Sequence, residues 1–441
     1  MDHELVLEGK TFLDHTFQQC CIGIDQGKIT KIKKILKGDR HHRFSREILL
    51  PAGIDVHVHF RDPGMTNKES FLSGSVAAAF GGISCVFDMP NTHPTTIAPK
   101  LISDKQRIAT QKSIVDFGLY AGITKESLLK TDDILKIASM SHGFKIFLGE
   151  TTNSLTLPPD YLVEVLRRIR PTRKPTFIHA EDNMCLFKHK IREQNLYDHH
   201  TARPPECEIK AIEKVISAAK QVETAVHICH VSSSSALNAL KDRPRCMSYG
   251  ITPHHSLLHN EMDNVPSSWL KVNPPLRSKT DQKTMFETVR RGDVSLLESD
   301  HAPHSRKEKE TDFSDAPCGI PGVETMYPLY LALAEKQQIP YRRVVSLLCE
   351  NPSQLLNVSK GFISEGYDAD IIVIDRKNIV KIQNENLHSK SDCSPYEGFS
   401  ALFPSMVFIR GNKTIEENEQ KVSKGYGSMV PLNKSEFLTE D

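Results

Sequence analysis

The stretch ILLPAGIDVHVHF, at residues 48–60, decides the fold of this chain. It is an apolar run that ends in two histidines, which is the pattern of a buried strand with functional groups at its carboxyl end. In a strand, residues i and i+2 point to the same side. His57 and His59 are therefore expected to face one site together, although an H-x-H pair alone is weak evidence for a metal centre.

Seven further apolar runs follow, with helix-length amphipathic segments between them. They are SCVFDMPN near residue 84, DFGLYAGI at 116, GFKIFLG at 143, TFIHAE at 176, AVHICHVS at 225, RCMSYGITPHH at 245 and VSLLESDHAPH at 294. Eight strands that alternate with helices predict a TIM-like (β/α)8 barrel of the α/β class, with its functional groups at the carboxyl ends of the strands.

Both ends of the chain carry shorter segments with the alternation of β-strands. They are LVLEGKTFLD and QQCCIGIDQGKITKIKKIL before residue 48, and GFISEGYDADIIVIDRKNIVKI from residue 361. We predict a β-rich appendage and tail from residues 1–48 plus 361–441, and a metal-dependent hydrolase barrel from residues 49–360. The polar tail after about residue 412 is expected at the periphery.

Charge and composition exclude several classes of function. With 56 basic and 55 acidic residues, the chain lacks the electrostatic footprint of a nucleic-acid-binding protein. Its first residues lack the basic start and apolar core of a signal peptide, and no apolar stretch of about 18 residues occurs. We therefore expect no membrane role and a cytoplasmic location. Its 10 cysteines include no C-x-x-C pair, and we expect reduced thiols in the core. A small polar substrate fits this balance best.

Polar side chains at other strand ends strengthen the metal hypothesis. His179 ends the fifth run, His230 the sixth and Asp300 the eighth. Each could be a hydrogen-bonded core residue by itself. Burying four imidazoles and a carboxylate at one end of a barrel is costly unless they have a common partner, and these are ligands that zinc accepts.

Lys145 lies inside the fourth apolar run, GFKIFLG. A snorkelling or salt-bridged side chain is the common role of such a lysine. Beside cations, however, an amine would have to lose its proton. If carbon dioxide carbamylates Lys145, the side chain becomes an anionic oxygen donor that can bridge two metal ions.

The chain resembles the amidohydrolase superfamily over almost its whole length. The order H-x-H, Lys, His, His, Asp carries this resemblance, and narrower motifs resemble the dihydroorotases, in their class I and multifunctional-protein branch. These motifs are DVHVHFRDPG (55–64), MPN (89–91), GFKIFLGET (143–151), HAED (179–182), CHVS (229–232), TPHH (252–255), NPPLR (273–277), SDHAPH (299–304) and PCGIPGVET (317–325).

The resemblance implies a binuclear zinc centre with a bridging hydroxide that interconverts N-carbamoyl-L-aspartate and L-dihydroorotate in pyrimidine biosynthesis. His57, His59 and Asp300 would hold one zinc ion, His179 and His230 the other, and carbamylated Lys145 would bridge them. Asp300 would also move the proton. The substrate contacts that it implies are Arg61, Asn91, Asn273, His304, Cys318, Gly319 and Thr151. The residue after Thr151 departs from the animal enzyme, which has an aromatic residue there.

Arg61 separates this activity from its rivals. It lies two residues beyond His59 and offers a fork of donors that suits the carboxylate of dihydroorotate; a surface ion pair with Asp62 is the alternative. Allantoinase or hydantoinase shares the barrel and metals but needs no such guanidinium. A non-catalytic partner of a carbamoyltransferase would have lost metal ligands, yet all six are present. A homodimer or an association with a carbamoyltransferase is compatible with the sequence.

Overall fold

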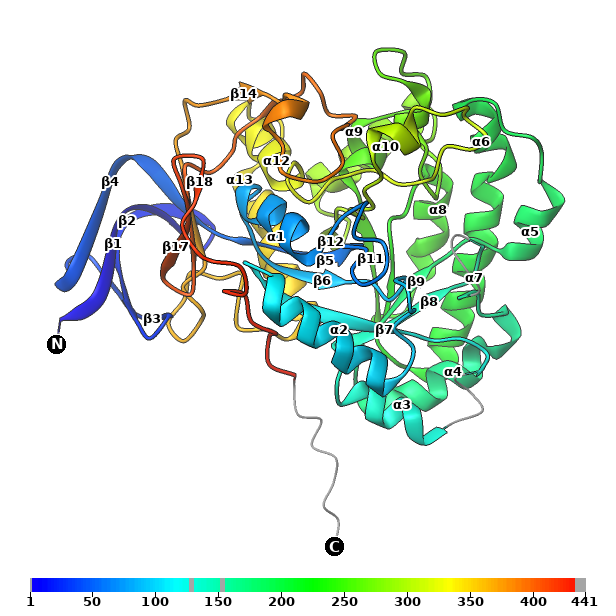
Figure 1. Cartoon of the computed structure of the whole chain (residues 1–441), viewed down its shortest axis with the longest axis horizontal. Coiled ribbons are helices and arrows are strands. Elements are labelled where there is room, and N and C mark those ends of the chain that lie inside the picture. The colour runs from blue at the N-terminus through cyan, green and yellow to red at the C-terminus, as the bar shows by residue number, and fades with distance from the viewer. Residues whose placement is uncertain (1, 127–130, 151–154, 433–441) are drawn as a thin grey trace, which may run out of the picture.

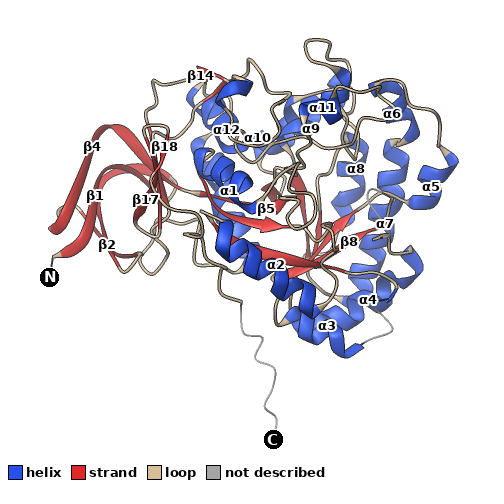
Figure 2. Ribbon diagram, viewed as in Figure 1, coloured by secondary structure: helices blue, strands red, loops and turns tan. Residues whose placement is uncertain are grey.

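Eight parallel strands close into a barrel around which the helices lie (Figure 2). The structure, a computed structural model, describes residues 2–126, 131–150 and 155–432. The barrel strands follow one another in chain order: β5 (Gly53–Val58), β6 (Ile83–Asp88), β7 (Asp116–Gly122), β8 (Gly143–Phe147), β9 (Thr176–His179), β10 (Val226–Ile228), β11 (Met247–Ile251) and β12 (Leu296–Leu297). A parallel bridge between Val58 and His301 closes the ring.

Helices between and after the strands cover the outside of the barrel. They are α1 (Phe71–Phe80), α2 (Pro99–Lys112), α3 (Thr131–Ala138), α4 (Leu162–Ile169), α5 (Asn183–Lys188), α6 (Leu196–Ala202), α7 (Pro205–Val222), α8 (Ser234–Ala239), α9 (Pro253–Leu257), α10 (Lys279–Arg291), α11 (Arg306–Lys309), α12 (Met326–Glu335), α13 (Tyr341–Val345) and α14 (Asn351–Leu356). The main core lies where apolar strand residues such as Val86, Ile146 and Ile178 meet apolar helix residues such as Leu166 and Val215.

A second sheet stands beside the barrel and contains strands from the N-terminal and the C-terminal parts of the chain (Figure 1). Its first part is β1 (His3–Leu13), β2 (Thr16–Asp25), β3 (Lys28–Lys33) and β4 (Gly38–Pro51); its second part is β13 (Ile371–Ile374), β16 (Met406–Ile409), β17 (Asn412–Glu416) and β18 (Glu419–Gln420). β4 pairs with β13 and thereby joins the two parts. A separate pair, β14 (Val380–Lys381) and β15 (Ser400–Ala401), completes the strands.

The predicted fold class is confirmed: the chain forms a TIM-like barrel with a β-rich sheet from its two ends. The domain limits at residues 48/49 and 360/361 stay a proposal. β4 runs across the first limit, and a single residue, Ala52, separates it from the first barrel strand. No helix of the described residues is long and apolar enough to span a membrane.

Two expectations need correction. The tail is not wholly peripheral, because Met429 bridges Phe117 of β7 in parallel and Val430 is buried against the barrel. The thiols are not all reduced, because Cys185 of α5 and Cys207 of α7 form a disulfide. Their separation of 22 residues gave no local signal for this pairing, which depends on how the two helices meet.

Candidate metal centre and substrate pocket

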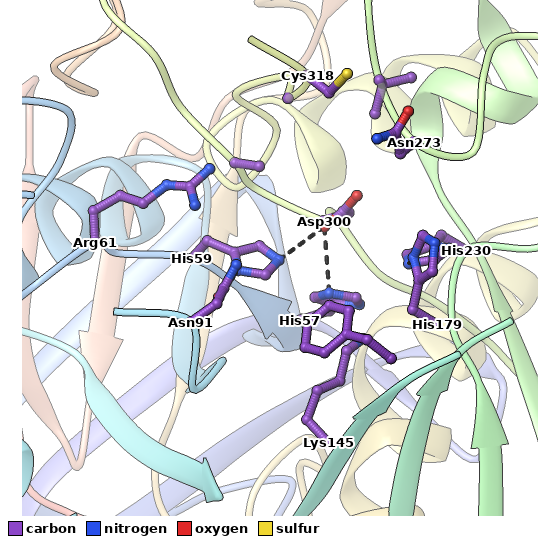
Figure 3. Close-up of a pocket in the computed structure, with 14 residues that line it drawn as sticks. His57, His59, Arg61, Asn91, Lys145, His179, His230, Asn273, Asp300 and Cys318 are labelled. Carbon is purple, nitrogen blue, oxygen red and sulfur yellow. Dashed lines mark hydrogen bonds and ion pairs between the residues drawn. The ribbon is translucent and has the colours of Figure 1, made fainter. Parts of the chain in front are cut away.

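The first half of the site is built where β5 and β12 adjoin. The Nε2 atoms of His57 and His59 lie 3.3 and 3.2 Å from the same oxygen, Oδ1 of Asp300. Figure 3 shows both imidazoles directed at this carboxylate. All three side chains are buried. The i, i+2 spacing predicted in the sequence therefore places both rings on one acceptor.

The second half lies beside it, at the ends of β8, β9 and β10. Nδ1 of His179 is 3.2 Å from Nε2 of His230, and the rings of His230 and His57 are 5.3 Å apart. Lys145 projects from β8 toward these rings (Figure 3). The structure thus brings the six predicted metal ligands into one buried cluster, although no strand contributes more than two of them.

Carboxyl and amide oxygens behind the histidines orient the rings. Glu298 lies 3.0 Å from Nδ1 of His57, and Asn91 Oδ1 lies 2.6 Å from Nδ1 of His59. Glu181 lies 2.8 Å from Nε2 of His179. With a metal ion bound, an oxygen acceptor would keep the proton on the outer nitrogen of each of these three rings, and the inner nitrogen would offer its lone pair to the ion.

The protonation states of these groups suit metal binding. Burial lowers the pKa of His57, His179 and His230, which favours neutral imidazoles. Burial alone would raise the pKa of Asp300, but His57 and His59 hold it below its usual value. Neutral imidazoles and a carboxylate within a few ångströms of one another are a donor set that zinc accepts, so the residues fit a metal centre.

The backbone is strained at three residues of the site. Arg61, His230 and Asp300 have φ values of 60°, 40° and 46°, in the left-handed region that side chains with a Cβ rarely adopt. Such conformations cost about 1–3 kcal/mol each and gather at functional sites. They turn the side chains that follow β5, β10 and β12 into the barrel mouth.

Lys145 is a buried amine whose Nζ donates a hydrogen bond to the thiol of Cys229, at 3.2 Å. Among the described residues it forms no ion pair with a carboxylate. The salt-bridged alternative considered for Lys145 therefore has no support within this part of the chain. Cys229 is buried, as expected of a small apolar side chain, and it also lies near His57 and His230.

Arg61 is buried and, within residues 2–126, 131–150 and 155–432, pairs with no carboxylate. Asp62, its alternative partner, instead binds Lys112 at 2.7 Å. The guanidinium lies 3.5 Å from Nε2 of His304. A buried cation without an ionic partner beside a cavity is suited to an anionic ligand.

A cavity of about 60 Å³ connects these groups. Its walls include the six ligands together with Arg61, Asn91, Phe147, Val272, Asn273, Ala302, Cys318 and Gly319. His304 lines an adjoining pocket that shares Arg61, Asn91 and Cys318 with this cavity. Thr151 lies outside the described residues.

Three orienting residues were missed in the sequence: Glu298, Glu181 and Arg203, whose guanidinium binds Glu181 at 2.5 Å. A signal existed for two of them. Glu298 precedes Asp300 by two residues and Glu181 follows His179 by two, a spacing that in an extended strand would place each on the same face as a ligand. Asn91 was predicted as a substrate contact, and the structure adds its contact with His59.

The chain has extensive similarity to known proteins. Residues 48–414 match the model of the amidohydrolase family. A dihydroorotase of Thermoplasma acidophilum is 37% identical over 431 residues, covering 97% of this chain and 98% of that protein. A dihydroorotase of Methanosarcina acetivorans is 34% identical over 439 residues, covering 96% of this chain and 94% of that protein.

Solved structures share the fold at lower identity. L-hydantoinase (dihydropyrimidinase) from Arthrobacter aurescens superimposes with a TM-score of 0.91 at 23% identity, covering 97% of this chain and 99% of that one. D-hydantoinase from Thermus sp. superimposes with a TM-score of 0.87 at 22% identity, covering 97% of this chain and 98% of that one. From the family match and the full-length relatives, the chain belongs to the amidohydrolase family and, within it, to the dihydroorotases.

Proposed function

We propose that the protein catalyses the reversible cyclisation of N-carbamoyl-L-aspartate to L-dihydroorotate and water, in de novo pyrimidine (UMP) biosynthesis. The observation that carries this proposal is Arg61, a buried guanidinium without an ionic partner in the described part of the chain, on the wall of the cavity that holds the histidine cluster. Both proposed reactants bear a carboxylate that it can bind through two parallel hydrogen bonds.

The centre would hold two zinc ions, with His57, His59 and Asp300 on one side and His179 and His230 on the other. Lys145 would bridge them as a carbamate: its ammonium group loses one proton, and the resulting amine adds to carbon dioxide and loses a second proton. A buried cation is thereby replaced by an anion. The chemistry that a bound pair of zinc ions supplies is activation of water and polarisation of the scissile carbonyl.

Asp300 is the proton carrier of the reaction. It is ionised, because the neighbouring histidines lower its pKa, and it accepts the proton of the attacking water. In ring opening it delivers that proton to the leaving ring nitrogen. In ring closure the same atoms take part in reverse order, so one carboxylate serves both directions.

The remaining wall positions the substrate. Arg61, Asn91 and His304 surround the carboxylate, while Asn273 and the backbone of Cys318 and Gly319 face the amide edges of the ring. Gly319 has a φ of 148°, and a Cβ there would lie 2.2 Å from the carbonyl oxygen of Ala302. Only glycine fits at this position of the wall. Thr151 keeps its proposed contact as a prediction.

Turnover of dihydroorotate, allantoin and hydantoin by one preparation, with metal content per chain, tests this function. We expect turnover of dihydroorotate and two zinc ions per chain. Preference for a neutral cyclic amide would instead support a hydantoinase or allantoinase, and a protein without metal or turnover would support a non-catalytic role. A cytoplasmic location and a homodimer or carbamoyltransferase complex stay predictions.

A further inference from the structure

The ammonium group of Lys309 lies behind the wall that faces the amide edges of the substrate. Lys309 is the last residue of α11, whose start is fixed by a capping box between Ser305 and Glu308. Its Nζ donates to three backbone carbonyl oxygens, of Lys271 at 3.2 Å, Pro317 at 2.9 Å and Gly319 at 3.0 Å. The side chain is buried.

These carbonyls belong to two loops that together form one wall of the cavity. One loop continues from Lys271 into Val272 and Asn273, and the other contains Cys318 and Gly319. A single backbone hydrogen bond also joins them, from Gly319 N–H to the Lys271 oxygen at 2.9 Å. Lys309 Nζ thus binds backbone carbonyl groups of both loops at once.

A role in stability alone explains this lysine poorly. Burial lowers its pKa to about 8, yet it forms no ion pair among the described residues. A buried cation without a carboxylate partner is costly, and an apolar side chain of similar size would pack without that cost. Three convergent carbonyls, in contrast, need a cation or donors between them if the loops are to stay together.

We propose that Lys309 is a positioning residue that holds the two loops at the spacing the substrate ring requires, and so sets substrate affinity without touching the metal ligands. This inference rests on the proposed function for its substrate. It predicts that Lys309 affects KM. Without Lys309, the distance between Asn273 and Gly319 would change, while Asp300 and the histidines would stay in place.

The test uses Lys309→Ala, with Lys307→Ala as the control because Lys307 is an exposed lysine of the same helix. We expect KM for dihydroorotate to rise by about tenfold or more in Lys309→Ala, with kcat changed by less than about threefold, since charged hydrogen bonds are lost outside the reacting centre. Zinc content should equal that of the wild type. Propylammonium should restore KM, whereas propanol should not, because the three carbonyls accept from a cation.

Lys309→Met keeps the volume filled and serves if the alanine variant folds poorly. An unchanged KM in either folded variant, or a raised KM accompanied by zinc loss and no rescue by propylammonium, would overturn the inference. Wild-type turnover of dihydroorotate tests the proposed function separately. If the wild type prefers another cyclic amide, the same variants are assayed on that substrate, so the two failures are distinguishable.

Discussion

His57 lies 3.0 Å from Glu298, with Nδ1 of the ring against Oε2 of the carboxylate. The other oxygen, Oε1, accepts the backbone N–H of His230 at 2.5 Å. Glu298 is fully buried. Through its two oxygens it contacts one residue from each half of the histidine cluster. This single carboxylate couples the orientation of both halves.

Glu298→Gln should weaken zinc binding by about 10- to 100-fold, because a neutral amide holds His57 less firmly. Titration of the metal-free protein with zinc against a competing chelator measures this effect. Glu310→Gln, at an exposed position, is the control. Equal zinc affinity in both variants would remove Glu298 from the centre.

Lys145→Ala should lose both bound metal and activity, because no other anion of the described residues can replace a carbamate between the two halves. Short carboxylic acids should restore part of the activity by occupying the space of the carbamate. Metal analysis and rescue kinetics measure these outcomes, with exposed Lys136→Ala as the control. A fully active wild-type protein whose Lys145 is an unmodified amine at high resolution would rule the carbamate out.

Arg61→Met should leave zinc content unchanged but raise KM, because the variant removes a charge-assisted bidentate contact. Such contacts contribute about 1.5–3 kcal/mol, or about one to two decades in affinity. Arg61→Lys keeps the positive charge but loses the two parallel donors of the guanidinium, so its KM should lie between that of the wild type and that of Arg61→Met. Steady-state kinetics on dihydroorotate measure this; unchanged constants would mean that the carboxylate is held elsewhere.

Asp300→Asn should abolish ring opening and ring closure together, even where zinc is retained, because the amide cannot carry the proton. In the wild type, hydrolysis should be favoured at alkaline pH and cyclisation at acidic pH, since the two directions need opposite protonation states of one site. pH profiles in both directions measure this. Near-normal turnover by a zinc-loaded Asp300→Asn variant would assign the proton transfer to another group, and His304 would be examined first.

Acid should destabilise the protein through His142. Burial lowers its pKa from 6.5 to about 4. The unfolded chain then binds the proton more tightly, so the stability that the neutral ring contributes is present above about pH 6.5 and is lost as pH falls toward 4. The loss is at most about 3 kcal/mol.

Urea unfolding of wild type and His142→Gln between pH 7 and 4.5 measures this contribution. The variant should lose less stability over that range than the wild type. His142 also donates to the carbonyl of Val430 and accepts the N–H of Leu119. Protonation of His142 should therefore also detach the C-terminal segment around Val430 from β7. Parallel pH dependences in the two proteins would contradict the assignment.

The sequence by itself determined the barrel and the ends of its strands. A buried parallel strand is recognisable in the sequence as an apolar run of strand length, and in most of these runs the polar, chemically capable residues come last. His57, His59 and Asp300 could therefore be assigned to one site before any contact was known. The same reasoning placed the two ends of the chain in one β-rich unit, since a barrel inserted between β segments brings its termini together.

Only the tertiary structure decided which atoms meet. Asp62 pairs with Lys112, so the guanidinium of Arg61 remains available to a ligand in the cavity. Cys185 forms a disulfide with Cys207. Lys309 donates to three carbonyls of two loops that are distant in the sequence. The hydrophobic periodicity of a sequence indicates whether a side chain is buried, but it does not indicate which residue that side chain contacts. Contacts such as that of His57 with Glu298, 241 residues away, depend on closure of the barrel and on the rotamers that its packing allows.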